Sequence, residues 1–265
     1  MLVLAIVVVA SRPEAPPVAN PYEEGLRLVK AANTTNVLVV TYGCGPITGY
    51  SPWDDLQFWQ AVAERVEDVA LWWYNGLPSA DVLANFSVVI YTAGGYWFPF
   101  GCSGEAYAFL RAAAERGLAV IVVAPDINYQ EGSSPSGEYL AFLREVLGIA
   151  GALGLMYYSD LPVNASGVHP VERGLPSSFV VKAVNSWPDV FDPAPGALGL
   201  LPAGRGVVSE FAIGTAAGLY PAYSAVEPTP PLYALVVYKR AATLGFVPYG
   251  LWKESPDVGL RLGVN

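Results

Sequence analysis

Four apolar runs, each followed by a segment with helical spacing, constrain the fold more than any other feature of this sequence. The runs are residues 36–42, 68–74, 87–92 and 118–124. The segments that follow them and read as helices are residues 51–66, 79–85, 104–116 and 136–147. Continuous apolar runs are typical of strands buried on both faces, as in a parallel sheet. Their alternation with helices predicts a doubly wound α/β fold with right-handed crossovers.

The rest of the chain is expected to extend this unit. Residues 21–32 predict a short helix, and residues 179–184 and 206–212 have the composition of strands. Residues 231–248 predict two strands that turn at Lys239 and Arg240. We therefore expect a flavodoxin-like, doubly wound, mostly parallel sheet with helices on both faces and a C-terminal β-hairpin. One domain is expected to span residues 21–265.

The charge and the metal-binding residue types exclude several classes of function. The chain has 14 Lys and Arg against 23 Asp and Glu, a formal net charge of −9. Nucleic acid is therefore not an expected partner, because phosphate contacts need Lys and Arg. His169 is the single histidine, and the chain has 2 Cys, which rules out a histidine-rich zinc centre or a zinc finger. We expect no metal and no cofactor.

Residues 1–20 form an apolar segment followed by a Pro-rich linker. The apolar run, residues 1–10, is shorter than the roughly 20 residues that a membrane-spanning helix needs. It is interpreted as the hydrophobic region of a secretory signal, with a strand or a truncated membrane anchor as alternatives. Sequons at Asn33, Asn85 and Asn164 are candidate glycosylation sites and agree with export. We expect an extracellular or cell-surface protein without a membrane-spanning helix.

Five short motifs carry a family resemblance. They are V-L-V-V from Val37, V-V-I-Y-T-A-G-G from Val88, residues 117–127, V-H-P-V-E-R-G-L-P from Val168, and R-A-A-T-L-G-F-V-P from Arg240. In this order they resemble the class I glutamine amidotransferase-like superfamily, in its divergent branch with the ThuA-like and β-galactosidase-trimerisation-type domains. The segment from Val168 is similar to the H-P-[IV]-x-x-G-L-P pattern of that branch. The resemblance covers roughly residues 34–250.

The sequence departs from the catalytic pattern that this resemblance implies. In the catalytic members, a nucleophilic Cys sits on a sharp turn after the fourth strand and is paired with a His and an acid. Here Asp126 stands at that position, and no His-x-Glu pair follows. Because a thiolate is needed to attack an amide and form a thioester, we do not expect glutaminase activity.

The two cysteines follow strands that are neighbours in a flavodoxin-like order. Cys44 comes after the first predicted strand, and Cys102 lies in the long loop after the third. We expect a disulfide between them, because the carboxyl-end loops of adjacent strands meet at one edge of the sheet. A catalytic cysteine and two free thiols are the alternatives, although neither cysteine has a histidine in its sequence context.

Aromatic residues gather at the same carboxyl edge, where open α/β sheets bind ligands. The predicted binding residues are Tyr42, Gly94, Gly95, Tyr96, Trp97, Asp126 and Asn128. They are interpreted either as an aromatic platform for a sugar or a partner protein, or as a self-packed loop over the end of the sheet.

Acidic side chains are predicted at this edge as well. Glu131 belongs with Asp126 and Asn128, and Asp54 and Asp55 are expected nearby. Such a cluster is interpreted as a Ca²⁺ or acid–base site, or as solvated and capping carboxylates. His169, which precedes Pro170, is either a structural turn residue or a catalytic base.

These observations favour a non-catalytic amidotransferase-like domain of an exported or cell-surface protein, used for binding or assembly. Its expected partner is a carbohydrate or a protein. One alternative is a hydrolase of carbohydrate or a small polar substrate that uses Asp126 with His169 or Glu131. Another is a structural subunit of a surface assembly, which would form oligomers.

Overall fold

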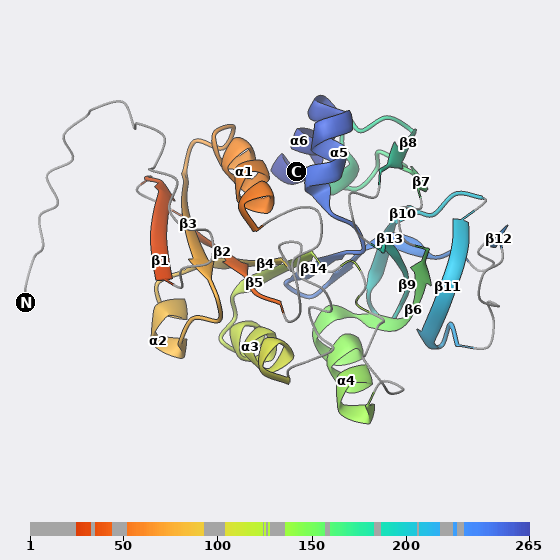
Figure 1. Ribbon diagram of the computed structural model, residues 1–265, viewed down its shortest axis with the longest axis horizontal. Helices are drawn as coiled ribbons and strands as arrows, with labels where there is room; N and C mark the ends of the chain where they lie inside the picture. The colour runs from red at the N-terminus through yellow and green to blue at the C-terminus, as the bar shows by residue number, and fades with distance from the viewer. Residues whose placement is uncertain are drawn as a thin grey trace, which may run out of the picture.

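The alternating apolar runs form the parallel half of one large sheet in the computed structural model (Figure 1). The structure describes residues 25–32, 35–43, 52–92, 104–123, 125, 127, 136–156, 160–182, 187–205, 207–217, 225–226 and 231–265. The five parallel strands, in spatial order, are β3 (Val69–Asn75), β2 (Thr35–Thr41), β4 (Val88–Thr92), β5 (Ala119–Val123) and β14 (Ala241–Leu244). Numbered along the chain, this order is 2-1-3-4-5, which is the flavodoxin-like order. The predicted fold class is confirmed.

Helices cover both faces of this parallel half (Figure 1). Above the sheet in Figure 1 lie α1 (Pro52–Ala63), α5 (Pro248–Glu254) and α6 (Pro256–Val264). Below it lie α2 (Ala80–Leu83), α3 (Gly104–Glu115) and α4 (Gly137–Phe142), which continues as a π-helical turn η1 (Leu143–Leu147). Among the described residues, none of the helices combines the length and hydropathy needed to cross a membrane.

An antiparallel half continues the sheet from β14. The predicted C-terminal hairpin is confirmed as β13 (Tyr233–Tyr238) and β14, with Tyr238 opposite Ala241. Beyond it follow β9 (Asp189–Pro193), β6 (Ile149–Leu155), β11 (Val207–Gly214) and β12 (Ala225–Val226), and β10 (Leu198–Pro202) also pairs with β13. A separate pair, β7 (Leu161–Asn164) and β8 (Ser178–Val181), flanks a short 3₁₀ turn, η2 (Pro170–Glu172).

The core has two layers, one on each face of the sheet. In β2, Val37 and Val39 pack into the layer under α1, whereas Leu38 and Val40 pack into the layer against α3. Because a parallel strand between two helix layers has no solvent-facing side, its residues form a continuous apolar run.

The predicted helix over residues 21–32 is wrong in its described part. Residues Gly25–Lys30 form strand β1, which adds antiparallel to β3 at the edge of the sheet. The guanidinium of Arg27 lies 5.6 Å from the ring centroid of Trp73. The ammonium of Lys30 donates to the carbonyl groups of Ala63 and Val66, where it meets the negative end of the α1 dipole. These cross-strand and capping contacts override the local helical pattern.

Candidate functional site

Three buried polar side chains mark the carboxyl ends of adjacent strands. The register places Thr41 of β2 beside both Asn75 of β3 and Thr92 of β4. All three are shielded from solvent. The indole N–H of Trp73 donates to the Thr41 hydroxyl at 2.9 Å, and this hydroxyl donates to Asn75 Oδ1 at 3.1 Å. The polar atoms at this end of the sheet thus hold its strands in register.

A buried carboxylate joins the next strand to a helix. Asp55 lies in the first turn of α1, and its side chain accepts a hydrogen bond from the Thr92 hydroxyl. It is fully buried, and its position in the first turn favours a negative charge. The prediction that Asp55 lies at this edge is confirmed. Its contact fixes the start of α1 against the end of β4.

Tyr42, a predicted binding residue, directly follows β2. Its hydroxyl donates to the Glu105 carboxylate at 3.3 Å, at the start of α3. Its carbonyl oxygen accepts from the Tyr91 hydroxyl at 2.8 Å. Burial raises the pKa of the Tyr91 phenol well above 10.0, and the nearby Tyr42 raises it further. Tyr91 therefore remains a protonated donor that secures the backbone at Tyr42.

The turn after β5 is anchored at Ile127, directly after position 126. Pro125 and Ile127 are buried. The backbone N–H of Ile127 donates to Asp189 Oδ2 at 2.6 Å, and the Tyr139 hydroxyl donates to its carbonyl group. The turn at which the amidotransferase resemblance places Asp126 is thus tied to β9 and α4.

A close backbone approach completes this anchor. The N–H of Asp189 donates to the Gly245 carbonyl at 2.6 Å. A Cβ at Gly245 would lie 2.1 Å from the Asp189 carbonyl oxygen, so only glycine fits there. The ends of β5 and β14 and the start of β9 therefore meet around one buried carboxylate.

Aromatic side chains extend this end of the molecule over α1 and α5. Trp53 packs edge-on against Trp73, with ring centroids 5.8 Å apart. Burial raises the pKa of Tyr249, and Asp54 raises it further, while Lys253 lowers it. The described residues thus place aromatic groups near a carboxylate and an ammonium, a mixture that suits ligands with polar and apolar faces.

The remaining predicted site residues at this edge lie outside the described residues. They are Gly94, Gly95, Tyr96, Trp97, Asp126, Asn128 and Glu131, together with the predicted disulfide partners Cys44 and Cys102 and the sequon residue Asn33. Of the other sequons, Asn85 and Asn164 are exposed. Among the described residues, no cluster of three or more His, Cys, Asp or Glu residues forms a metal site.

His169 caps a turn. Its Nδ1 accepts the backbone N–H of Val171 at 3.3 Å, which starts η2. Glu172, 1% exposed, accepts backbone N–H groups of Ser166 at 3.1 Å and Leu201 at 3.2 Å. These contacts describe a structural segment, and the pairing of His169 with the undescribed residue 126 stays a prediction.

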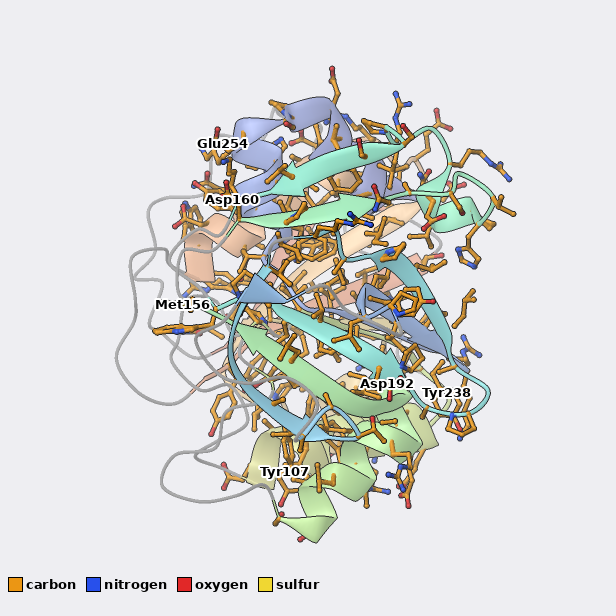
Figure 2. All side chains as sticks on the ribbon, turned by 90° about the vertical axis from the view of Figure 1, so that its right-hand side faces the viewer. Tyr107, Met156, Asp160, Asp192, Tyr238 and Glu254 are labelled. Atoms are coloured by element: carbon orange, nitrogen blue, oxygen red, sulfur yellow. The ribbon has the colours of Figure 1, made fainter. Side chains whose placement is uncertain are left out.

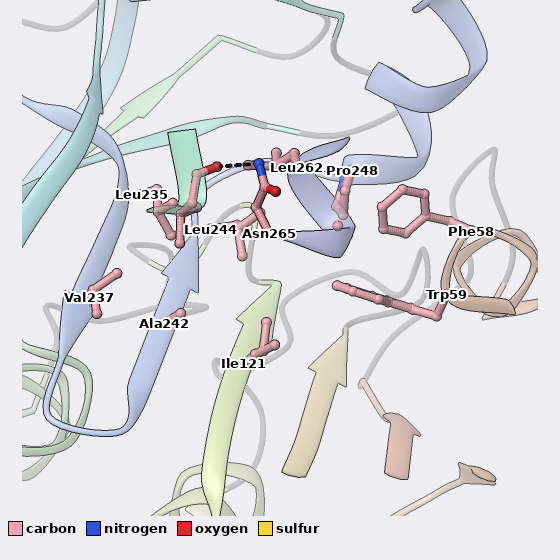
Figure 3. A pocket seen from close by; sticks show the side chains of 12 residues that line it. Phe58, Trp59, Ile121, Leu235, Val237, Ala242, Leu244, Pro248, Leu262 and Asn265 are labelled. Atoms are coloured by element: carbon pink, nitrogen blue, oxygen red, sulfur yellow. Dashed lines mark hydrogen bonds between the residues drawn. The ribbon is translucent and has the colours of Figure 1, made fainter. Parts of the chain in front are cut away.

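A small apolar cavity of about 130 Å³ lies between α1, α6 and the sheet (Figure 3). Trp59, Ile121 and Leu262 contribute to its walls. The Asn265 amide at its rim donates to the carbonyl groups of Val171 and Arg173, at 3.4 and 2.9 Å. The described residues that line the cavity include no nucleophile or acid–base pair, so the carboxyl end of the sheet is the better candidate site.

Sequence reasoning missed the anchoring role of Asp189 and the Thr41–Asn75 contact. Asp189 lies 62 residues from Ile127 in the chain, so no local pattern joins them. A polar residue directly after a run of apolar or aromatic residues was the available signal for Thr41, Asn75 and Thr92.

Comparison with known proteins gives structural neighbours only. No family model and no curated protein matches the chain. A glutamine amidotransferase from Thermotoga maritima is 14% identical, with a TM-score of 0.45 over 88% of this chain and 89% of that one. A ThuA-like protein from Parabacteroides merdae is 12% identical, with a TM-score of 0.45 over 88% and 89%. α-L-fucosidase isoenzyme 2 from Paenibacillus thiaminolyticus is 11% identical, with a TM-score of 0.48 over 89% of this chain and 32% of that one.

The neighbours include a glutamine amidotransferase and a ThuA-like protein, the kinds of protein that the sequence motifs resemble. At these identities and TM-scores they assign no family and no activity to this chain.

Proposed function

We propose that this protein is a non-catalytic, amidotransferase-like domain that binds a ligand at the carboxyl end of its sheet. The observation that carries the proposal is that buried carboxylates at this end hold the segments from which the candidate site is built. Asp55 and Asp189 are fully buried and accept hydrogen bonds from the end of β4 and from the turn after β5. These contacts hold the end of β4 and the turn after β5 in place, and a binding site requires such rigid support.

The residue types at this end also argue against amide hydrolysis. The turn after β5 carries Asp126 where a thiolate would be needed. His169, the single histidine of the chain, caps η2. A hydrolase built on Asp126 and His169 would require the imidazole of His169 to give up its hydrogen bond with the Val171 N–H.

The proposed ligand is a carbohydrate. Tyr96 and Trp97 follow β4 in the sequence, and α1 contains Trp53. Aromatic rings offer flat apolar faces, which suit the C–H faces of sugar rings, and the adjacent carboxylates and amides suit sugar hydroxyls. An exported or cell-surface location, with a Cys44–Cys102 disulfide, belongs to the same proposal.

The test is binding of the full chain to a glycan array, followed by calorimetry with any bound oligosaccharide. The Trp97→Ala variant is expected to weaken binding at least tenfold. The control Trp72→Phe, on the face of β3 opposite Trp73, should leave binding unchanged. Hydrolysis of glutamine or of the bound glycan that is lost in Asp126→Asn would overturn the non-catalytic assignment. Self-association without glycan binding would favour the structural-subunit alternative.

Location is tested separately by counting free thiols, with and without reductant, by mass spectrometry. A Cys44–Cys102 disulfide would support an oxidising compartment. Two alkylatable thiols would contradict it. One thiol that reacts much faster than the other would favour a thiolate mechanism.

A further inference from the structure

A second cavity lies at the opposite, amino end of the parallel strands. It has a volume of about 580 Å³ and lies between α3, η1 and the β13–β14 hairpin. Leu118, Val120 and Ala241, at the starts of β5 and β14, contribute apolar surface to it. Tyr238 lies at the end of β13, where Figure 2 labels its side chain, and it also lines the cavity. The cavity is distinct from the candidate site because it lies at the other end of the same strands.

Three cationic side chains converge on this cavity. They are Arg111 of α3 and Lys239 and Arg240 of the hairpin turn. Arg111 forms a half-exposed ion pair with Glu145 at 3.1 Å. Within the described part of the chain, no carboxylate forms an ion pair with Lys239 or Arg240. Glu115 and Glu145 also line the cavity, so three cations outnumber two carboxylates there in a chain whose net charge is −9.

Lys239 occupies a backbone conformation that glycine adopts more readily. It is the first of the two turn residues of the hairpin, and its φ is +52°. The first position of such tight turns, when φ is positive, is usually glycine. The Lys239 ammonium lies 4.6 Å from the ring centroid of Tyr238 and 3.5 Å from the Glu145 carbonyl oxygen. A long cationic side chain is therefore held at the cavity despite an unfavourable backbone.

The opposite wall contains a second uncommon backbone feature. Glu145 and Val146 line the cavity from η1, a π-helical turn. Such turns are rare and occur frequently at functional sites. Gly148 ends this turn with a φ of +72°, and a Cβ there would lie 2.4 Å from the Tyr238 Cβ. The π turn and the strained hairpin are therefore packed directly against each other beside the cavity.

We propose that this cavity binds a small molecule that carries an anionic group, a carboxylate or a phosphate, on an apolar body. Lys239 and Arg240 bind the anion, and Arg111, oriented by Glu145, supplies a further donor. The side chains of Leu118, Val120 and Ala241 contact the apolar body. This site is independent of the proposed carbohydrate site.

Calorimetric titration of the full chain with two probes, phenyl phosphate and benzoate, tests the proposal. At least one probe is expected to bind saturably, and at least tenfold more tightly than its counterpart without an apolar ring, inorganic phosphate or acetate. The double variant Lys239→Gln, Arg240→Gln is expected to weaken this binding at least tenfold. The matched control is Lys182→Gln, which removes an exposed cation of the Lys182–Asp160 pair and should leave binding unchanged.

Three results would overturn the proposal. One is that neither probe binds saturably at probe concentrations up to 20 mM. Another is equal binding by the wild type and a double variant whose circular dichroism spectrum is native. The third is equal affinity for the ring-bearing and the ring-free anions, which would remove the apolar part of the site.

Discussion

The charged side chains at the two ends of the parallel strands differ in their burial. At the carboxyl end, Asp55 and Asp189 are fully buried and hydrogen-bonded to the roots of loops. At the amino end, Lys239 and Arg240 are exposed beside an open cavity. A buried polar group contributes to folding as well as to function, whereas an exposed charge can be removed with little effect on the fold. Variants at the two ends therefore answer different questions.

The largest expected effect is at Asp189. Replacing Asp189 by Ala removes the acceptor of the buried Ile127 N–H and should lower the free energy of unfolding by about 3 kcal/mol. Urea denaturation measures this loss. Asp189→Asn keeps an acceptor oxygen and should lose roughly 1 kcal/mol. Stability of the Ala variant equal to that of the wild type would show that the carboxylate does not hold the turn.

A matched pair of threonines gives the next effect. Thr92→Val removes the donor to the buried Asp55 carboxylate and should destabilise the protein by about 2 kcal/mol. The hydroxyl of Thr243 in β14 is equally buried and, among the described residues, has no hydrogen-bond partner. Thr243→Val is therefore expected to be neutral or slightly stabilising. Equal losses from both variants in thermal denaturation would contradict the assigned role of Asp55.

Tyr91 adds a pH dependence to the carboxyl end. Tyr91→Phe should cost about 1 kcal/mol near pH 7, because the carbonyl group of Tyr42 loses its donor. The pKa of Tyr91 in the folded chain lies above the ordinary value of 10.0. Its contribution is therefore fully present below pH 10 and is lost as the pH rises from there through the folded-state pKa. Urea titrations from pH 7 to 11 should show the gap between wild type and variant narrowing only above pH 10.

The smallest effect, at the amino end, has the opposite sign. Lys239→Gly removes the strain of a positive φ, which costs a residue with a side chain about 1 kcal/mol of stability. It also removes the cation–π contact with Tyr238, which contributes roughly 0.5 kcal/mol. The net expectation is a gain of about 0.5 kcal/mol in unfolding free energy, measured by urea denaturation. Lys239→Ala keeps the strain and should show no gain. A Gly variant less stable than the wild type would show that the turn is unstrained.

The parallel half was predictable because its strands leave a strong local signature. Strand β2 is buried on both faces and reads as an unbroken apolar run. In the antiparallel half, β6 has the sequence IAGALGL, and β9 has the sequence DVFDP. Small residues and proline carry little strand preference, so these strands depend on their neighbours in space.

The candidate site was predictable only in part, for a related reason. Tyr42 and Asp55 directly follow or begin elements that the sequence predicts, so their placement at the carboxyl edge followed from the topology. The contact between Asp189 and Ile127 joins segments from the two halves of the sheet. Its position depends on the order of the antiparallel strands, which no local pattern in the sequence specifies.

Strand β14, which joins the parallel half of the sheet to the antiparallel half, affects the order in which the strands can pair during folding. β14 lies between β5 and β13, and Val120 pairs with Ala241, 121 residues later in the sequence. A growing chain can therefore assemble β2, β3, β4 and β5 early, but the outer side of β5 stays unpaired until β14 emerges. Such long-range pairing slows folding and leaves a strand edge open to other chains. Production at low temperature or with a chaperone should therefore raise the yield of soluble protein more than stabilising the early strands would.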